Sequence, residues 1–420
     1  MEKTVVAKSQ IKNRSVFMNA VGIDVSKGKN TISVMQPLGV VVADPFEISH
    51  TERELEKLIR FLKSLPGETK IVMESTGRYS EPIARYLHDA GMFVSVVNAI
   101  LIHNYGGNTK VRKAKTDKKD AARIANWALE YWLDLREYIP EEDIRQMLKV
   151  YNRQYNQYNK LKVMLKNNLI ALLDQTFPCV NKLFTAPPRK SDGHEKWVDF
   201  ALRFWHCECV CGLSEKKFTE RYAAWCMKAG YYFSVDKAFE IYASACGHVG
   251  LFPKNDSTKT IITNAIRQLI QVEESIRAFQ VEMEKLTSLL PEYEVVRSLY
   301  GVGPVYCAQL MAEIGDIGRF DSKKALIGYA GIDAPPYQSG SINIGSRNIS
   351  KRGSADLRKT LFQIMQVILQ NSPENEPVYQ FLDKKRSEGK PYKVYMIASA
   401  NKFLRIYYAR VKECLATQNS

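Results

Sequence analysis

The 420-residue sequence has no long apolar segment. No stretch approaches the about 18 uninterrupted apolar residues that a transmembrane helix needs, so we expect no membrane span. Residues 1–19 also lack the apolar core and cleavage site of a secretory signal, and the sequence contains eight cysteines. We therefore expect mostly free thiols in a reducing cytoplasm. Disorder as the main state is excluded, because hydrophobic residues make up 45% and charged residues 25% of the chain.

Acidic residues are in deficit. The chain has 45 Asp and Glu against 60 Lys and Arg, which gives a formal charge of +15. Residues 340–420 carry 14 basic and 6 acidic residues, so more than half of the excess lies in a fifth of the chain. This balance favours a polyanionic partner, either nucleic acid or an anionic membrane surface. The length suits two or three domains.

After a polar tail at 1–19, residues 20–140 alternate strand-like and helix-like patterns. Three short apolar runs at close spacing predict an antiparallel meander. A Thr-x-x-Glu capping box at Thr51 and Glu54 predicts the start of the first helix. The predicted elements are strands at 21–24, 31–35, 40–42, 70–74 and 92–97 and helices at 51–65, 81–90 and 117–130. Their βββαβαβα order predicts a mixed α/β domain.

The rest of the chain is predicted to be mostly helical. In 141–290, apolar and aromatic residues at alternating spacings of four and three predict two long coiled-coil-like helices. They flank an insert at about 178–256 that we expect to be irregular and partly helical. Residues 291–420 contain glycine-rich turns, a Gly/Ser/Asn-rich loop at 338–347 and a basic helix at 354–371.

Four acidic residues of the first domain stand where strands end or a helix begins. Asp24 ends the first strand and Glu74 ends a later buried strand, while Asp117 and Asp120 open a helix and share one face of it. If the two strands are neighbours, all four carboxylates can meet, and they then repel one another unless cations offset them. Two Mg²⁺ ions suit such an oxygen ligand set and support displacement at phosphorus. The alternative for any single acid is an ordinary surface carboxylate, and for Asp117 and Asp120 a favourable contact with the helix dipole.

Several motifs, in this order, resemble the DEDD insertion-sequence transposases, a family that includes the pilin-gene inversion recombinases and the bridge-RNA-guided recombinases. The motifs are GIDVSK at 22–27, MESTGRY at 73–79, KTDKKDA at 115–121, LYGVGP at 299–304, YAG at 329–331, YQSG at 337–340 and SKRG at 350–353. The insert is longer than the family pattern leads us to expect.

The resemblance implies an RNase H-like (RuvC-like) domain at 20–140, a coiled-coil linker with its insert at 141–290 and a small helical transposase domain at 291–420. It implies that Asp24, Glu74, Asp117 and Asp120 form a catalytic, Mg²⁺-binding tetrad and that Ser339 is the nucleophile. It further implies DNA as substrate, a structured noncoding bridge RNA as guide and a homodimer or homotetramer. The setting implied is the bacterial cytoplasm, with action at the nucleoid.

A serine hydroxyl needs a base, a metal or positive charge to act as a nucleophile, and basic residues lie close to Ser339 in the sequence. From the residues alone, Ser341, Ser346, Ser350 and Ser354 compete with Ser339 for this role. The Gly-Val-Gly turn resembles a helix-hairpin-helix turn that can meet a phosphate, or it is a plain helix-helix turn. The predicted nucleic-acid contacts are Lys115, Gly301, Gly303, Arg347, Lys351, Arg352, Arg358 and Lys359.

Two other functional classes stay open, and a third is disfavoured. A metal-dependent DNA junction nuclease would use only the acidic tetrad, and a non-catalytic nucleic-acid-binding protein of RNase H-like fold would use neither acids nor serine. A sugar-kinase or actin-like ATPase shares the opening strand-Gly-x-Asp pattern but needs a second phosphate loop, which the sequence does not show. The Cys-x-Cys-x-Cys run at 207–211 does not match the spacing of structural zinc sites, so we expect small apolar core residues there.

Overall fold

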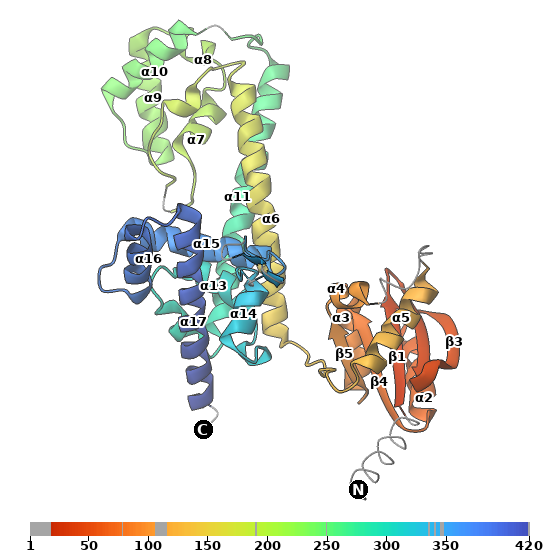
Figure 1. The fold of residues 1–420 in the computed structure, drawn as a ribbon. Coiled ribbons are helices and arrows are strands. Elements are labelled where there is room, and N and C mark those ends of the chain that lie inside the picture. The colour runs from red at the N-terminus through yellow and green to blue at the C-terminus, as the bar shows by residue number, and fades with distance from the viewer. Residues whose placement is uncertain are drawn as a thin grey trace, which may run out of the picture. The chain divides into compact units, whose positions relative to one another are not determined.

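The computed structural model describes residues 18–77, 79–105, 116–189, 191–248, 250–334 and 348–418, together with the backbone of two short strands at 337–339 and 342–344. The chain separates into two compact units, residues 1–140 and 141–420 (Figure 1). None of the helices in these ranges is long and apolar enough to cross a membrane.

The first unit is built on a five-stranded sheet. Its elements are β1 (Met18–Val25), β2 (Lys29–Gln36), η1 (Pro37–Gly39), β3 (Val40–Ser49), α2 (Glu52–Ser64), β4 (Glu68–Glu74), α3 (Ser80–Asp89), β5 (Phe93–Val97), α4 (Ala99–Asn104) and α5 (Asp117–Glu130). The strand order is β3-β2-β1-β4-β5; the first three strands are antiparallel, and β4 and β5 run parallel to β1. The predicted meander and element order are confirmed, with the short helix α4 as an addition.

Both faces of the sheet are buried, and the alternation of β1 explains how. Val21 and Ile23 belong to the core that β1 forms with α2 and α3. Ala20 belongs to the opposite core, which contains Ile124 and Ala128 of α5. Because successive side chains of a strand point to opposite faces, the even-numbered positions of β1 lie on the α5 side. Asp24 therefore lies on the same face as α5.

The predicted capping box at the start of α2 is wrong in its detail. Thr51 is the N-cap residue, but its side chain makes no capping hydrogen bond. The backbone carbonyl of Thr51 accepts from the amide of Glu54 instead, at 3.1 Å. The helix thus begins where the pattern predicts, and three buried leucines on one face hold it to the sheet: Leu55, Leu58 and Leu62.

The second unit is organised around two long helices, α6 (Asp143–Leu173) and α11 (Asp256–Ser288), which lie side by side (Figure 1). The ring of Phe279 on α11 packs edge-on against that of Tyr158, with centroids 5.0 Å apart. Lys162 Nζ lies 2.8 Å from a carboxylate oxygen of Glu273. The later residue of α6 thus contacts the earlier residue of α11, so the two helices are antiparallel.

The insert between these helices is more regular than predicted. It contains η2 (Val180–Lys182), α7 (Lys196–Arg203), α8 (Glu208–Cys211), α9 (Glu215–Ala229) and α10 (Val235–Gly247). Its core is rich in aromatic rings and includes residues from the C-terminal end of α6 and the N-terminal half of α11. Within the 207–211 run, Cys207 is buried in this core, as expected of a small apolar core residue, whereas Cys209 and Cys211 are half-buried and pack against it.

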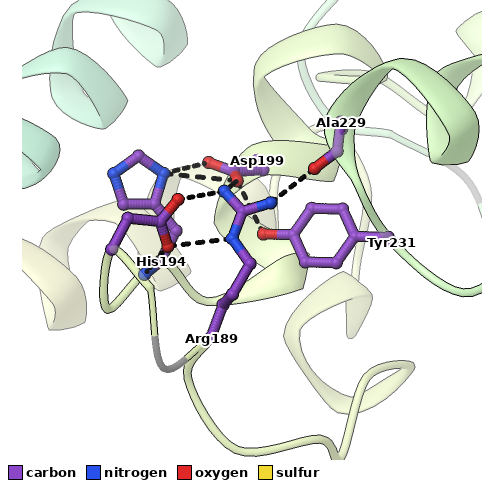
Figure 2. A network of polar contacts seen from close by, with 6 residues as sticks. Arg189, His194, Asp199, Ala229 and Tyr231 are labelled. Atoms are coloured by element: carbon purple, nitrogen blue, oxygen red, sulfur yellow. Dashed lines mark hydrogen bonds and ion pairs between the residues drawn. The ribbon is translucent and has the colours of Figure 1, made fainter.

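A polar network joins the loop before α7 to the loop after α9 (Figure 2). Arg189 donates to Asp192 and to the backbone carbonyl of Ala229. Asp199 accepts from the hydroxyl of Tyr231 at 2.6 Å and lies 3.1 Å from Nδ1 of His194. The hydrogen bond from Arg189 lowers the pKa of Asp192 to about 2. The hydrogen bonds to Ala229 and from Tyr231 therefore join the two loops, and the ion pairs of Arg189 hold the first loop in place.

The C-terminal part packs against the start of α6 and the end of α11. Its elements are α12 (Tyr293–Arg297), α13 (Pro304–Ile314), η3 (Ile317–Arg319), α14 (Lys323–Ala330), β6 (Tyr337–Ser339), β7 (Ile342–Ile344), α15 (Ala355–Asn371), α16 (Pro377–Ser387) and α17 (Tyr392–Gln418). A buried ion pair fixes α6 to this part: Arg145 donates to both carboxylate oxygens of Glu292, at 2.5 and 3.1 Å.

Candidate functional site

Two of the four predicted acids lie at the ends of neighbouring strands. β1 and β4 are parallel, and Ile23 is paired with Met73. Asp24 and Glu74 follow these two residues directly, so they stand side by side at the carboxyl edge of the sheet. The predicted adjacency of the two strands is confirmed.

Helix α5 reaches this edge because β1 carries a glycine where the two elements meet. A Cβ on Gly22 would lie 2.1 Å from the backbone oxygen of Ala121 and 2.5 Å from the backbone nitrogen of Ala125. Only a residue without a side chain allows such a close approach. The helix runs antiparallel to β1, since Lys29, just beyond the carboxyl end of β1, contacts Asp117 in the first turn of α5. That first turn is therefore next to Asp24.

The two acids of α5 are paired with cations. Lys29 Nζ lies 2.9 Å from Glu47 and 3.5 Å from Asp117, and these partners, Glu47 first, raise the pKa of Lys29. Arg123 forms an ion pair with Asp120 one helical turn away. Within the described ranges, no three His, Cys, Asp or Glu side chains form a group that could hold a metal ion.

The sequence analysis did not predict either of these cationic partners. Arg123 could have been predicted, because it stands three residues after Asp120 on the same helix. Lys29 could not, because its contact with Asp117 depends on how the β1–β2 hairpin packs against α5.

Ser339 lies in a short two-stranded hairpin of the second unit. The backbone of β6 pairs with that of β7, with Ser339 opposite Ile342. The described residues on either side of the segment that carries this hairpin are hydrogen-bonded to one another. The backbone amide of Ser350 donates to the carbonyl of Asp333 at 2.8 Å, and that of Lys351 donates to Gly331 at 3.0 Å. These bonds clamp the base of the serine segment.

Two glycines make the clamp possible. Gly331 has a φ of +63°, and a Cβ on Gly353 would lie 1.8 Å from the backbone oxygen of Tyr329. The amide of Ser354 donates to that same oxygen at 2.8 Å. The YAG and SKRG motifs are thus in direct contact, although about twenty residues separate them.

Two of the serines that compete with Ser339 have structural partners. The hydroxyl of Ser350 donates to the carboxylate of Asp333. The hydroxyl of Ser354 donates to Glu313 at 2.7 Å and accepts from the amide of Leu357 at 3.1 Å, which caps α15. Ser341 and Ser346 lie outside the described residues.

The predicted basic contacts are in different environments. Lys351 is exposed and has a φ of +54°, a conformation that non-glycine residues rarely adopt. Arg352 is also exposed. Arg358 is half-buried and donates to the carbonyls of Ala330 and Gly353 at 3.1 and 3.0 Å, so it supports the clamp. Lys115 and Arg347 lie outside the described residues.

The Gly-Val-Gly turn connects α12 and α13 and opens on a cleft of about 680 Å³. Gly301 has a φ of +80° and packs against Ile364 and Ile368 of α15, so a side chain is disfavoured there. Gly303 is the N-cap residue of α13 and has open space around it. Lys359 lines the same cleft and donates to Asn156 at 3.2 Å. The structure thus brings three of the predicted contacts to one cleft: both glycines and this lysine.

Two family models match the chain. The DEDD model of the IS110 group, described as a transposase, matches residues 21–178, and a model described as a transposase of the IS116/IS110/IS902 family matches residues 293–380. Together they match more than half of the chain. The stretch between them contains most of the insert.

Whole-length relatives support the same grouping. The 43.6 kDa protein of insertion element IS110 from Streptomyces coelicolor is 22% identical over 395 residues, 93% of each chain. The 44.8 kDa protein of insertion element IS116 from Streptomyces clavuligerus is 21% identical over 94% of each chain. The pilin gene-inverting protein of Moraxella bovis is 22% identical over 82% of this chain and 80% of its own.

These matches define the class: the protein is an enzyme that acts on DNA. The resemblance expected from the motifs is confirmed. The chain belongs to the DEDD-type transposases of the IS110/IS116 family.

Proposed function

We propose that this transposase cuts and rejoins DNA strands to excise and integrate an insertion sequence, with Ser339 as nucleophile and the four acids as its metal site. The observation that carries the proposal is the meeting of the first turn of α5 with the carboxyl edge of the sheet. The strand order, three antiparallel strands followed by two parallel ones with α5 against β1, supports an RNase H-like (RuvC-like) fold for the first unit.

The donor set fits a hard divalent cation such as Mg²⁺, because all four ligands are carboxylates. Asp24 and Glu74 would hold the cation from the strand ends, and Asp117 and Asp120 would join them on exchanging Lys29 and Arg123 for the metal. When bound, the cation supplies positive charge at the phosphate under attack. Until then, the two basic side chains offset the charges of Asp117 and Asp120.

The serine step is a balanced exchange of bonds. Oγ of Ser339 forms a bond to phosphorus while one P–O bond of the strand breaks. The hydroxyl proton leaves the serine, and the departing strand oxygen takes up a proton. Reversal of this step with another strand end rejoins DNA and frees the serine, so no outside energy source is needed. The clamp holds together the two ends of the segment that carries Ser339.

Three finer statements are part of the proposal. A structured noncoding RNA guides the choice of donor and target DNA, as the resemblance implies. The protein acts as a homodimer or homotetramer in which Ser339 of one subunit completes the acidic site of another. It works in the bacterial cytoplasm, on nucleoid DNA.

Covalent trapping tests the central claim. The protein, its RNA and Mg²⁺ are mixed with labelled element-end DNA, denatured and examined for DNA-linked protein. We expect linkage with the wild type and none with Ser339→Ala, whereas Ser341→Ala and Ser346→Ala keep it. We also expect Asp24→Asn to abolish linkage and Asp44→Asn, an exposed acid on β3, to leave it intact.

The same assay separates the rival function. Cleaved but unlinked DNA that is identical for the wild type and Ser339→Ala would identify a metal-dependent junction nuclease. Loss of linkage only in Ser341→Ala or Ser346→Ala would move the nucleophile to that serine.

A further inference from the structure

A large groove lies at the base of the serine segment, on the second unit. It has a volume of about 1530 Å³ and is lined by parts of α14, α15, α16 and α17. Ala334 and Asn348, which flank the serine segment in the sequence, both line it. A molecule in this groove would therefore lie where the chain departs toward Ser339 and where it returns.

The groove combines an apolar floor with a basic rim. Among the described residues that line it, six are basic: Lys324, Lys351, Lys393, Lys402, Arg405 and Arg410. One is acidic, Asp333, and its carboxylate already accepts a hydrogen bond from Ser350. The floor is apolar and includes Ile327, Ile332, Phe362, Phe381, Ile397 and Ile406.

Charge and shape together select the occupant. Six cations against one engaged acid demand a polyanion. A duplex would present phosphates to the rim but leave the apolar floor unused. A strand with unpaired bases uses both, since its bases pack on apolar and aromatic side chains while its phosphates meet the lysines and arginines.

The rim is long enough for several nucleotides. From Lys393 to Arg410, α17 advances by about 26 Å at its ordinary rise per residue. Lys393, Arg405 and Arg410 are all exposed, so their charges are available to a ligand.

We infer that this groove binds a single strand of DNA next to the phosphate that Ser339 attacks. The inference rests on the proposed function, because that function makes the strand a DNA strand. None of the three exposed cations of α17 takes part in the chemistry itself.

Binding of a labelled 20-nucleotide oligo-dT by the full-length protein at several salt concentrations tests the inference. The variant replaces Lys393, Arg405 and Arg410 with glutamine. Its matched control replaces three exposed lysines of the insert with glutamine: Lys216, Lys217 and Lys228. Each single-strand phosphate contact contributes about 0.7 to the slope of log affinity against log salt. We expect the groove variant to lose about 2 from the slope and the control to lose nothing.

A second pair of variants keeps the test independent of surface lysines. Val394 lines the groove and is 51% exposed, and Val235 of the insert is 48% exposed. Both stand in the first turn of a helix. Val394→Glu places an acid among the rim cations and should weaken oligo-dT binding at least tenfold, whereas Val235→Glu should not. Unfolding in urea, equal for all variants, shows that each is folded.

Each outcome of these measurements either supports or overturns the groove inference. Equal losses in the groove variant and its control would reduce the effect to bulk charge and overturn the inference. A loss confined to oligo-rU would make the groove an RNA site, and a loss confined to a 20-base-pair duplex would exclude the single strand; both overturn it. If the slope falls as expected while the wild type never links to DNA, the groove stands and the proposed function fails. If the wild type links to DNA but the groove variant has an unchanged salt slope, the proposed function stands and the groove inference fails.

Discussion

Replacement of Gly22 by alanine tests the link between the packing of the first unit and its acidic site. The added Cβ would lie 2.1 Å from the backbone oxygen of Ala121, whereas ordinary contacts begin near 3.4 Å. Because the opposing atoms are backbone, no side chain can swing away. Helix α5 or strand β1 must move by about 1 Å, and overpacking of this kind costs about 1–3 kcal/mol.

Alanine also has a stabilising effect at this position, which is smaller than the cost of the clash. Alanine in a strand is favoured over glycine by about 0.5–1 kcal/mol because it loses less backbone freedom on folding. The clash with two backbone atoms calls for the upper end of the overpacking range, so we expect a net loss of about 2 kcal/mol. With a urea dependence of about 2 kcal/mol per molar, the midpoint of the first unit falls by about 1 M.

The assay has a local and a functional readout. Hydrogen exchange of peptides from α5 should accelerate, and covalent DNA linkage should fall further than the folded fraction does, because Asp117 and Asp120 move with the helix. The control is Ile71→Ala, which empties space in the core on the opposite face of the sheet and costs about 2–5 kcal/mol. It should destabilise the unit but leave linkage per folded molecule unchanged.

Two results would refute this reasoning. If peptides from α5 exchanged hydrogen at the same rate in Gly22→Ala as in the wild type, the packing of the helix would not depend on the glycine. Equal linkage per folded molecule in both variants would show that the position of α5 does not matter to the chemistry.

Three further predictions follow from other parts of the molecule. Glu292→Gln removes the buried partner of Arg145 and leaves it only the exposed Glu142, whose carboxylate lies 3.1 Å from Nε of Arg145. The substitution should cost about 3 kcal/mol, measured as urea unfolding of the second unit; an unchanged midpoint would mean that the pair with Glu292 contributes little. Burial raises the pKa of Cys307 to about 12 from an ordinary 9, so native protein at pH 8 should resist alkylation there, as mass spectrometry can check. Since this thiol holds its proton more tightly when folded, its contribution to stability is complete below pH 9 and is lost as the pH rises toward 12. Finally, a mixture of Asp24→Asn and Ser339→Ala proteins should regain DNA linkage if subunits share sites, and a mixture as inactive as either variant alone would place both groups in one subunit.

Much of the first unit was predictable because its signals are local. Apolar runs marked the strands, and the acids at their ends marked the edge where a site forms. The partners of those acids were less accessible, since Lys29 meets Asp117 only through the folding of the β1–β2 hairpin onto α5. The capping box failed because a backbone carbonyl replaced the side chain of Thr51, which composition does not reveal.

In the second unit, the two long helices followed from their spacing, but the insert did not. Its helices are held by rings that contact one another from several elements, such as Phe200 of α7 and Trp225 of α9. Such contacts leave a weak periodic signal. The groove was equally hidden, because α17 supplies half of its lining and the rest comes from α14, α15, α16 and the residues that flank the serine segment. Only the excess of basic residues near the C-terminus hinted at it.

The antiparallel pair α6–α11 has a consequence for how the second unit comes apart. Leu148 and Met283 belong to the C-terminal core, whereas Leu169 and Ile266 belong to the core of the insert. Leu148 and Leu169 lie about 32 Å apart along α6. The two cores share no buried residue, so damage to one leaves the other in place. The insert can therefore melt as a separate cooperative unit. For the same reason, substitutions in the core of the insert should leave the serine segment, the groove and their core intact.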